Sequence, residues 1–535
     1  MLSRFKLFGR LLVIGIILIT LAGNPEPVSA VSYNFASPTG TPVNACTYTD
    51  PCNLQKAVDI SSLGGIVFAA AGTYHPYTTP SDQVLLITNS VHIYGGWDGI
   101  SGPDPVPDPT ANISIIDGQN SRQGVTIMLA ADEVVTLSGF TIRNGNATGL
   151  IAICSASGPA GCGGGIMASG GKTTIEDCII EDNVASTTTD ATYRTGYGGG
   201  IYIQNPGNLG VTIQNNIIRY NDASTASCGT LAIAGKGGGI YIEGESASGD
   251  ITITENEIYR NEAAIGPDCI GRGVGLTVVD GSGVISRNYI HDNNQNHSSS
   301  GSGLFSNSSF SDSFELSINE NRFINNQGAD VVYLQFFNGS LASNTIINPE
   351  SLYGVSLNSN YSGEMSVLVN NVIAQNTNTN ILMNGGATTS VTANLYYNTL
   401  DDAPYGISLM SNTYLSLTNS IVSHHSTAGI KKDPGGTNMA VYIADTLFHG
   451  NTSDGDWNSN LRPISGDPLY ADTLSGDYHI QAISAARDTA TNAGYAYDFE
   501  NDPRPMGSGA TPYDVGADEF WWKIMLPMII KSSGS

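Results

Sequence analysis

Short apolar segments recur along most of this chain, spaced 21 to 40 residues apart. Each repeat has a polar or small residue, then any residue, then Ile, Leu or Phe, as in Asn-Ile-Ile at 216–218 and Asn-Val-Ile at 371–373. In several copies a second Asn follows five residues after the first. Ahead of each copy lies a small residue, usually Gly, followed by alternating apolar residues, as in Gly-Ile-Tyr-Ile at 200–203. An internal repeat of this length is typical of a stacked, solenoid-like architecture.

The alternation within each repeat has a period of two, which indicates β-strands with one buried face. One such repeat cannot bury a core alone, but stacked repeats can. We therefore predict an all-β fold, a right-handed, single-stranded parallel β-helix with an N-terminal cap and a small C-terminal cap domain. We expect the repeated Asn residues at its corners, because Asn tolerates left-handed backbone angles and its amide can bond to the Asn of the next coil.

Five segments follow from this pattern. Residues 1–30 read as a signal peptide, with basic residues at 4, 6 and 10, an apolar run over 11–22 and Val-Ser-Ala at 28–30. Residues 31–65 are predicted to form the N-terminal cap, because 52–60 has helical spacing. The β-helix is expected over 66–465. Residues 466–520 lose the repeat and are predicted to form the C-terminal cap or anchor-type domain. The apolar tail, 521–535, is too short to span a bilayer.

Charge and cysteines narrow the setting in which the chain works. The formal net charge is −26. Removal of 1–30, with three basic residues and one acidic residue, gives −28. Such a balance argues against nucleic acid as a partner, because phosphate binding requires clustered Lys and Arg. Export permits disulfides, and we expect Cys46–Cys52, Cys154–Cys162 and Cys228–Cys269, which leaves Cys178 unassigned. The cysteine spacing predicts no structural metal site.

Over 130–450 the chain resembles the parallel β-helix repeat family, which includes pectate lyase-like enzymes and many non-enzymatic surface proteins. The segment 51–57 is similar to an entry motif of bacterial surface β-helix proteins, with departures at Gln55 and Lys56. Motifs at 466–469, 476–480, 502–505 and 514–519 resemble a choice-of-anchor C-terminal domain, and the tail at 525–531 resembles short tails of exported proteins. The resemblance implies the fold and an extracellular location, secreted or at the cell surface. It does not imply an activity, because this fold hosts many functions.

The spacing between motifs predicts a flanking wall. From each corner motif to the apolar residue that opens the next Gly-led strand, the distance is 16 to 26 residues in the first five coils and 9 to 11 in the next five. Stacking in register puts the extra segments beside one another, at 146–162, 184–198, 222–237, 262–273 and 294–301. Long loops cluster at binding sites, although tolerated surface drift would give the same spacing.

Next to this wall, the outward residues of the Gly-led strands are expected to form two columns, spaced by about 4.8 Å per coil. Aromatic faces stack on sugar rings, while amides and carboxylates bond to hydroxyls, so this flank would suit an extended polysaccharide. Aromatic residues also simply favour exposed strands. The candidate ligand-binding residues are Tyr202, Gln204, Tyr241, Glu243, Phe305, Asn307, Tyr333 and Gln335.

Catalytic residues are harder to assign. Glu243 is the one acid of the columns in the wall region, and we find neither an adjacent base nor the paired carboxylates that glycoside hydrolysis or Ca²⁺ binding requires. Arg272, Tyr193, Arg194 and His297 lie in the wall segments and are candidates to reach it. The resemblance implies Ca²⁺ only if the chain is a lyase; otherwise we expect no cofactor.

Three hypotheses therefore stay open. The favoured one is a non-catalytic, adhesin-like protein that binds polysaccharide or cell-surface glycans. We expect this protein to be a monomer, either free outside the cell or associated with the cell envelope. The second is a polysaccharide lyase or glycoside hydrolase acting under the N-terminal wall. The third is a purely structural surface rod.

Overall fold

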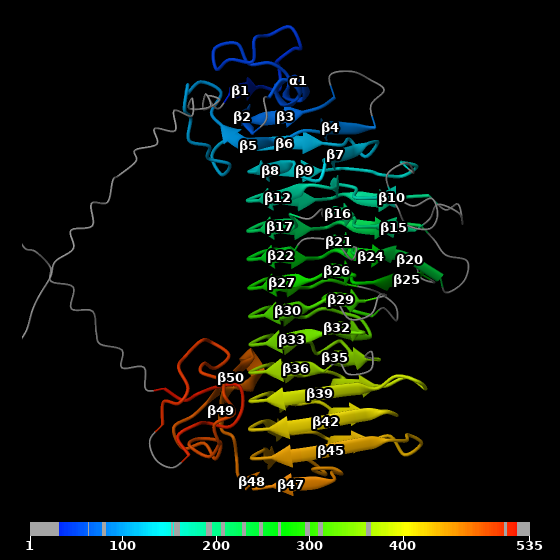
Figure 1. Cartoon of the computed structure of the whole chain (residues 1–535), viewed down its shortest axis with the longest axis vertical. Helices are drawn as coiled ribbons and strands as arrows, with labels where there is room; N and C mark the ends of the chain where they lie inside the picture. The colour runs from blue at the N-terminus through cyan, green and yellow to red at the C-terminus, as the bar shows by residue number, and fades with distance from the viewer. Residues whose placement is uncertain are drawn as a thin grey trace, which may run out of the picture.

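The computed structural model describes residues 32–61, 64–76, 82–150, 154, 161–188, 195–204, 209–226, 232–244, 250–265, 269–294, 300–308, 314–359, 365–507 and 511–521. The predicted signal peptide and all of the tail beyond Trp521 lie outside these residues. Within them, no helix is both long enough and apolar enough to cross a membrane. The described chain winds into a rod of stacked coils, with its first coils at one end and its last coils at the other (Figure 1).

Three long sheets run the length of the rod, and every strand pair within them is parallel. The fold is thus the predicted right-handed parallel β-helix. Each full coil visits the sheets in the same order, named here sheet 1, sheet 2 and sheet 3.

Sheet 1 consists of β1 (Tyr33–Ala36), β2 (Gly65–Ala70), β5 (Val91–Trp97), β8 (Val134–Ser138), β12 (Lys172–Glu176), β17 (Val211–Gln214), β22 (Ile251–Thr254), β27 (Gly283–Ser286), β30 (Leu316–Asn319), β33 (Gly339–Ala342), β36 (Ser366–Val369), β39 (Val391–Tyr396), β42 (Thr413–Thr418), β45 (Met439–Ala444) and β47 (Ser459–Leu461).

Sheet 2 consists of β3 (Gly72–Tyr74), β6 (Ser114–Asp117), β9 (Phe140–Arg143), β13 (Ile179–Glu181), β18 (Ile217–Arg219), β23 (Glu257–Tyr259), β28 (Tyr289–His291), β31 (Arg322–Ile324), β34 (Thr345–Ile347), β37 (Val372–Ala374), β40 (Thr399–Asp401), β43 (Ile421–Ser423), β46 (Leu447–His449) and β48 (Ile464–Ser465).

Sheet 3 consists of β4 (Gln83–Ile87), β7 (Gln123–Met128), β11 (Ile166–Ser169), β16 (Ile201–Gln204), β21 (Ile240–Glu243), β26 (Leu276–Val279), β29 (Leu304–Asn307), β32 (Asp330–Gln335), β35 (Tyr353–Asn358), β38 (Thr379–Asn384), β41 (Tyr405–Leu409) and β44 (Ala428–Lys432).

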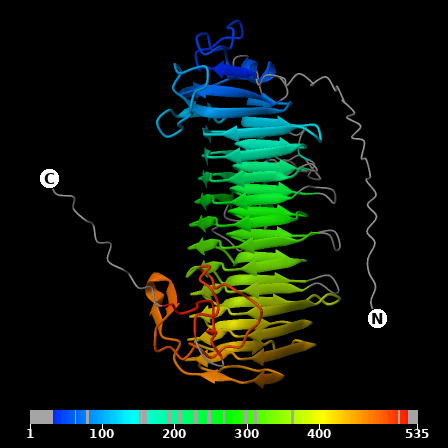
Figure 2. The same ribbon diagram turned by 60° about the vertical axis from the view of Figure 1, so that its left-hand side comes forward.

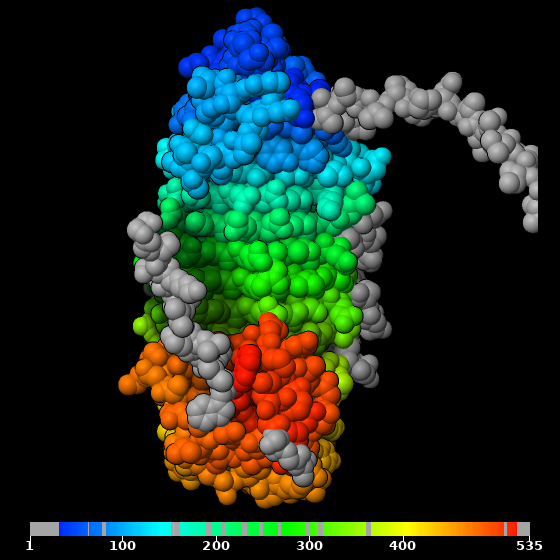
Figure 3. Space-filling model, turned by 90° about the vertical axis from the view of Figure 1, so that its left-hand side faces the viewer, coloured from blue at the N-terminus to red at the C-terminus, as the bar shows by residue number. Residues whose placement is uncertain are grey.

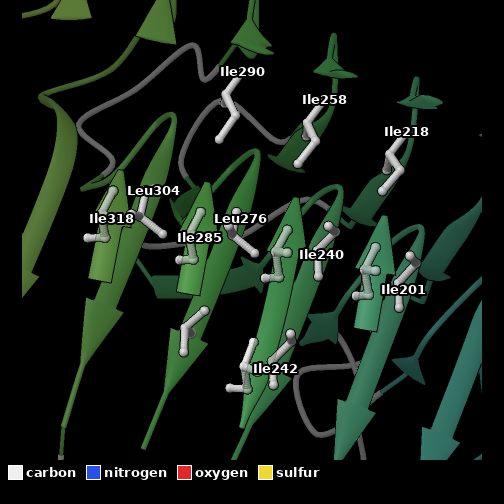
Figure 4. Packing of buried hydrophobic residues seen from close by; sticks show 14 of the residues in the cluster. Ile201, Ile218, Ile240, Ile242, Ile258, Leu276, Ile285, Ile290, Leu304 and Ile318 are labelled. Atoms are coloured by element: carbon white, nitrogen blue, oxygen red, sulfur yellow. The ribbon is translucent and has the colours of Figure 1, made fainter. Parts of the chain in front are cut away.

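The core fills the inside of the rod with columns of aliphatic side chains. Ile201, Ile240, Leu276 and Leu304 stack along sheet 3, and the inward residues of the other two sheets face them (Figure 4). All four are fully buried. Because apolar residues recur at the inward positions of successive coils, the buried apolar area grows with the number of coils rather than with the width of the rod.

Two ladders of buried Asn residues hold the coils in register at the ends of the sheet 2 strands. The first ladder lies just before the strands, as at Asn216 and Asn256, and the second lies just after them, as at Asn221 and Asn261. In the second ladder, Asn221 donates from its side-chain amide to Asn261 Oδ1 at 3.0 Å and to the backbone oxygen of Ile180 at 2.9 Å. Asn261 does the same to Asn293 at 3.1 Å. The predicted contact between coils is therefore confirmed. The left-handed backbone belongs to the preceding residue, such as Tyr220 or Arg260, and not to the ladder Asn itself.

The N-terminal end is closed by α1 (Leu54–Asp59), whose side chains at Leu54, Ala57 and Val58 join the core. Asn53 begins the helix by accepting a hydrogen bond from the backbone N–H of Lys56 at 2.8 Å. A disulfide between Cys46 and Cys52 secures the segment ahead of it, as predicted.

The segment after 465, named here the C-terminal unit, lies along the side of the last coils and not across the end of the rod (Figures 2 and 3). It contains β49 (Tyr470–Asp472), the short helix η2 (Thr473–Ser475) and β50 (Asp477–Ile480). The last coil is closed by its own chain, where Trp457 packs against Phe448. The unit buries apolar side chains that face outward from sheet 2, including Ile347 and Val372.

The predicted wall is present and is itself built from parallel strands. The segments between sheets 2 and 3 form a sheet of β10 (Gly161–Cys162), β15 (Gly196–Tyr197), β20 (Ala232–Lys236) and β25 (Cys269–Arg272), and a second of β14 (Val184–Ser186), β19 (Asp222–Ser224) and β24 (Glu262–Ala264). The Cys154–Cys162 disulfide is confirmed. Cys269 is disulfide-bonded, but its predicted partner Cys228 lies outside the described residues. Cys178 is buried as a free thiol.

Candidate functional site

The outward residues of sheet 3 form the two predicted columns. In the first column, Met167 pairs in register with Tyr202, Tyr202 with Tyr241, and Phe305 with Tyr333. In the second, Gln204 pairs with Glu243, and Asn307 with Gln335. Sequence periodicity therefore assigned these side chains to the correct face of the correct sheet.

The wall covers much of the first column, which corrects the picture of an open aromatic stripe. Tyr202 is 0% exposed and Tyr241 3% exposed, with their rings stacked at 5.6 Å between centroids. Phe305 is 3% exposed and stacks on the ring of Tyr333 at 5.1 Å. Cys162 and Tyr197 of the wall pack over this column. Its buried rings stabilise the wall, and their faces are not open to a sugar.

The partly exposed residues of the two columns are mostly polar, with apolar Val279 between Glu243 and Asn307. Gln204, Glu243, Asn307 and Gln335 of the second column are half-buried, as is Tyr333 of the first. Glu243 accepts a hydrogen bond from the hydroxyl of buried Tyr202 at 3.1 Å, which fixes the carboxylate at the edge of the wall. The site that the structure offers is thus the line where the wall meets sheet 3, named here the junction.

Two cations of the wall line this junction. Lys236 and Arg272 are register partners on adjacent strands, so they stand about one strand spacing apart. The Lys236 ammonium lies 5.3 Å from the centre of the Tyr197 ring, and the Arg272 guanidinium lies 5.5 Å from that of Phe305. Neither forms an ion pair within the part of the chain that the structure describes.

Electrostatics couple these groups. Burial and the charge of Arg272 lower the pKa of Lys236, while Glu243 acts in the opposite direction. Burial and Glu243 raise the pKa of Tyr197. Lys236, Arg272 and Glu243 therefore form one interacting group. The sequence pattern predicted Arg272 and Glu243 but not Lys236, whose register match with Arg272 depends on an irregular pairing between β20 and β25.

A further titratable group lies one coil beyond the wall. Asp330 is buried at the start of β32, and burial raises its pKa to about 6 although Ser356 and Ser300 hydrogen-bond to it. Ser356 is the outward residue of the next coil in the same column as Tyr333. Burial raises the pKa of Tyr333, the charge of Asp330 raises it further, and Arg272 lowers it. Asp330 therefore extends the same set of coupled groups down the rod.

Some predicted contributors cannot be placed. Tyr193, Arg194 and His297 lie outside the described residues. Among the residues that the structure does describe, no group of three or more His, Cys, Asp or Glu side chains could hold a metal ion.

Comparisons with known proteins give distant likenesses in architecture. No protein-family model and no curated protein sequence matches the chain. The complex of XylC with xylose has a TM-score of 0.42 and 12% identity, covering 91% of this chain and 98% of that one. Pectate lyase Pel9A has a TM-score of 0.36 and 11% identity, covering 92% and 97%. The A-module of the mannuronan C-5 epimerase AlgE4 from Azotobacter vinelandii has a TM-score of 0.33 and 16% identity, covering 74% and 90%. These values carry no argument about the ligand of this chain.

Proposed function

We propose that this chain is an exported β-helix protein that binds an acidic polysaccharide at the junction, without catalysis. The observation that supports this is the pair Lys236 and Arg272. Two like charges held on adjacent strands, partly buried and with no described carboxylate in an ion pair, repel each other. In a chain of net charge −26, carboxylates are plentiful, so this arrangement favours an anion supplied by a ligand.

The surrounding residues suit a carbohydrate carrier for that anion. Gln204, Asn307 and Gln335 present amides in one column along the rod, where they can bond to hydroxyl groups. Asn307 and Gln335 are in adjacent coils, whereas Glu243 and Val279 occupy the two coils between Gln204 and Asn307. The half-buried ring of Tyr333 offers an aromatic surface beyond the end of the wall. An extended chain lying parallel to the rod would contact several coils. Export is supported by the predicted signal peptide and by the disulfides, which persist in oxidising compartments.

The second candidate is a lyase or hydrolase, and one observation favours it. The structure brings Glu243 within electrostatic range of Lys236, and Lys236 has a lowered pKa, so the junction contains both an acid and a candidate base. In this alternative Arg272 would neutralise a uronate carboxylate while Lys236 accepted a proton. A lyase would release unsaturated chain ends and a hydrolase reducing ends.

The two candidates separate in one experiment. Purified mature protein is mixed with polygalacturonate and, in parallel, with neutral dextran, while binding is followed by affinity electrophoresis and product by ultraviolet absorbance and a reducing-end assay. We expect binding to polygalacturonate only, weakened at least tenfold by Lys236→Gln with Arg272→Gln. The matched control, Lys172→Gln with Arg260→Gln, removes the same charge elsewhere and should bind normally. Product formation would establish the second candidate, and equal loss in both double variants would refute a specific site.

A further inference from the structure

A pocket of about 510 Å³ lies where the C-terminal unit meets sheet 1. Its floor comes from β33 and β36 of the rod, and Tyr495 and Tyr497 of the unit form one side. Figure 3 shows this unit, in orange and red, projecting from the coils on which it sits. The pocket is within the size range of small-molecule sites. It is far from the junction, which lies on the wall side of sheet 3.

Its lining is amphipathic. Met365, Val367 and Val369 supply apolar surface from β36 and the residue just before it, and Tyr497 supplies an aromatic ring that is 56% exposed. Asn338, Ser340 and Asn501 add polar groups around them. A sugar ring has the complementary form, because it carries an apolar face of C–H groups and a rim of hydroxyls.

One buried polar atom in the lining has no partner. Asn370 is only 5% exposed, and its side-chain amide donates to the backbone oxygen of Tyr497 at 2.8 Å. Its Oδ1 is buried and accepts no hydrogen bond from any described group. An unpaired buried acceptor destabilises the fold, so such atoms in native proteins call for an explanation. A hydroxyl donor from a ligand would satisfy it.

The charges of the pocket exclude an anion. Glu315 lines it with an exposed side chain, and no Lys, Arg or His is among its described lining residues. Asp498 also lines it, but its carboxylate is buried and accepts hydrogen bonds from backbone N–H groups of the C-terminal unit. A uronate or sulfated sugar would meet the Glu315 carboxylate here and no cation, whereas it would meet two cations at the junction. A neutral sugar would not be repelled by this charge.

We propose that the pocket between the C-terminal unit and sheet 1 binds a neutral saccharide, with the ring over Val367 and Tyr497 and a hydroxyl donating to Asn370 Oδ1. This second site would let one molecule hold an acidic polysaccharide on one flank and a neutral glycan on the other. It depends on the C-terminal unit being docked, because Tyr497 and Asp498 come from that unit.

The test uses the full mature chain and saturation-transfer NMR with the methyl glycosides of glucose, galactose and xylose, and with sodium galacturonate as the charged counterpart. We expect at least one neutral glycoside to give a signal that Val367→Trp weakens at least tenfold by filling the pocket. The matched control is Val284→Trp, because Val284 lies in the same outward column of sheet 1, is 38% exposed and does not line the pocket.

A second variant protects the test against misfolding. Tyr497→Ala shortens an exposed side chain, so it should leave thermal unfolding unchanged and still weaken the neutral glycoside several-fold. The signal should persist in Lys236→Gln with Arg272→Gln, which separates this site from the junction. The proposal is overturned if no neutral glycoside binds, if Val367→Trp and Val284→Trp behave alike, or if galacturonate binds as well as the neutral sugars and is lost with them.

Discussion

The upper and lower halves of the rod share one coil but cover different sheets. In the upper coils, from β11 to β29, the chain leaves sheet 2, builds the wall and covers the aromatic column of sheet 3. In the lower coils it passes directly to sheet 3, and the C-terminal unit covers sheet 2 instead. Below, the C-terminal unit buries the outward residues Val372, Ile421 and Leu447 of sheet 2. In the upper coils the same outward column is half-exposed, and it holds Ile179 and Ile217, followed by Glu257 and Tyr289.

This difference shows that the residues that specify the stacked coils are not the residues that specify what covers the coils. The inward residues are alike in both halves, and one ladder of Asn residues runs from Asn216 in the upper coils to Asn398 in the lower coils, so these features fix the rod. The outward residues vary: apolar residues are buried beneath the wall and beneath the C-terminal unit, whereas Ile179 and Ile217 of sheet 2 are only half-buried. The places where a cover ends are where polar and charged groups remain partly accessible, as at the junction and at the pocket beside the C-terminal unit.

The largest effect is expected from breaking the ladder of the upper half. Asn261→Ala removes the acceptor of Asn221 and the donor to Asn293 and to the backbone oxygen of Ile218. Several buried groups are then unpaired, so we expect a loss of roughly 3–5 kcal/mol in the free energy of unfolding. Urea unfolding measures the loss, and hydrogen exchange should locate it in the upper coils. Asn384→Ala, at an exposed position, is the control and should cost under about 0.5 kcal/mol.

A similar loss in the lower half should detach the C-terminal unit without unfolding the rod. Arg504 is buried within the unit, pairs with Glu519 at 3.0 Å and donates to the backbone oxygens of Gly516 and Ala517. Arg504→Met strands a buried carboxylate, which costs about 3–5 kcal/mol. Limited proteolysis should then release the unit while circular dichroism of the rod persists. Arg260→Met, at a fully exposed site, should leave the digestion pattern unchanged. Simultaneous loss of rod and unit would show that the two halves are not independent.

The wall should respond to loss of its buried rings. Tyr241→Ala leaves a cavity beneath the wall, and truncation of a buried aromatic residue costs about 3 kcal/mol. We expect protease sensitivity in the wall and a smaller change in the lower coils. Tyr442→Ala is the matched control, because Tyr442 is exposed on sheet 1. If Tyr241→Ala leaves the wall intact, the ring is not what holds it.

The smallest effect is a pH dependence confined to the C-terminal unit. Burial alone would lower the pKa of His479, but hydrogen bonds to Glu500 and Asp477 outweigh it and raise the pKa to about 9. Because the folded pKa is above the unfolded value of about 6.5, this stabilisation is complete below pH 6.5 and is lost as the pH rises through 9. After allowance for solvent screening, we expect protonated His479 to contribute about 1–2 kcal/mol to the free energy of unfolding of the C-terminal unit.

Thermal unfolding of the unit between pH 6.5 and 9 measures this dependence, and His479→Gln should abolish it. The charge of Asp518 also acts on His479, but the titration of Asp518 itself falls in a different pH range. Burial raises the pKa of Asp518 to about 7, so its penalty develops mainly between pH 4 and 7. A variant that keeps the slope above pH 7 would assign the dependence to another group.

Much of the architecture was predictable because the same residue spacing and the same contacts recur in successive coils of a solenoid. The alternation in Gly-Ile-Tyr-Ile at 200–203 and 239–242 placed Ile201 and Ile240 inward and Tyr202 and Tyr241 outward, as the register shows. The change in motif spacing predicted the wall. The ladder of Asn221, Asn261 and Asn293 was also predictable, although the left-handed angle falls one residue earlier.

The candidate site was predictable only in part. Period-two alternation says which way Tyr202 points, but it cannot say whether another segment lies over it, and Tyr197 and Cys162 do. Lys236 was missed because irregular pairing brings it beside Arg272. Outward apolar residues do not by themselves reveal the position of the C-terminal unit, because they occupy the same column of sheet 2 in both halves, as Ile217 and Val372 do.

By itself, the sequence determined the coil, its length, its inward columns and the place where extra chain leaves it, because each of these depends on neighbours a fixed number of residues away. Only the tertiary structure decided which outward residues are buried, which cations stand together and where the C-terminal unit rests. Those outcomes depend on contacts between segments with no fixed spacing, such as Tyr397 with Thr491 or Lys236 with Arg272. Periodicity carries no information about such contacts, and they are what create both proposed binding sites.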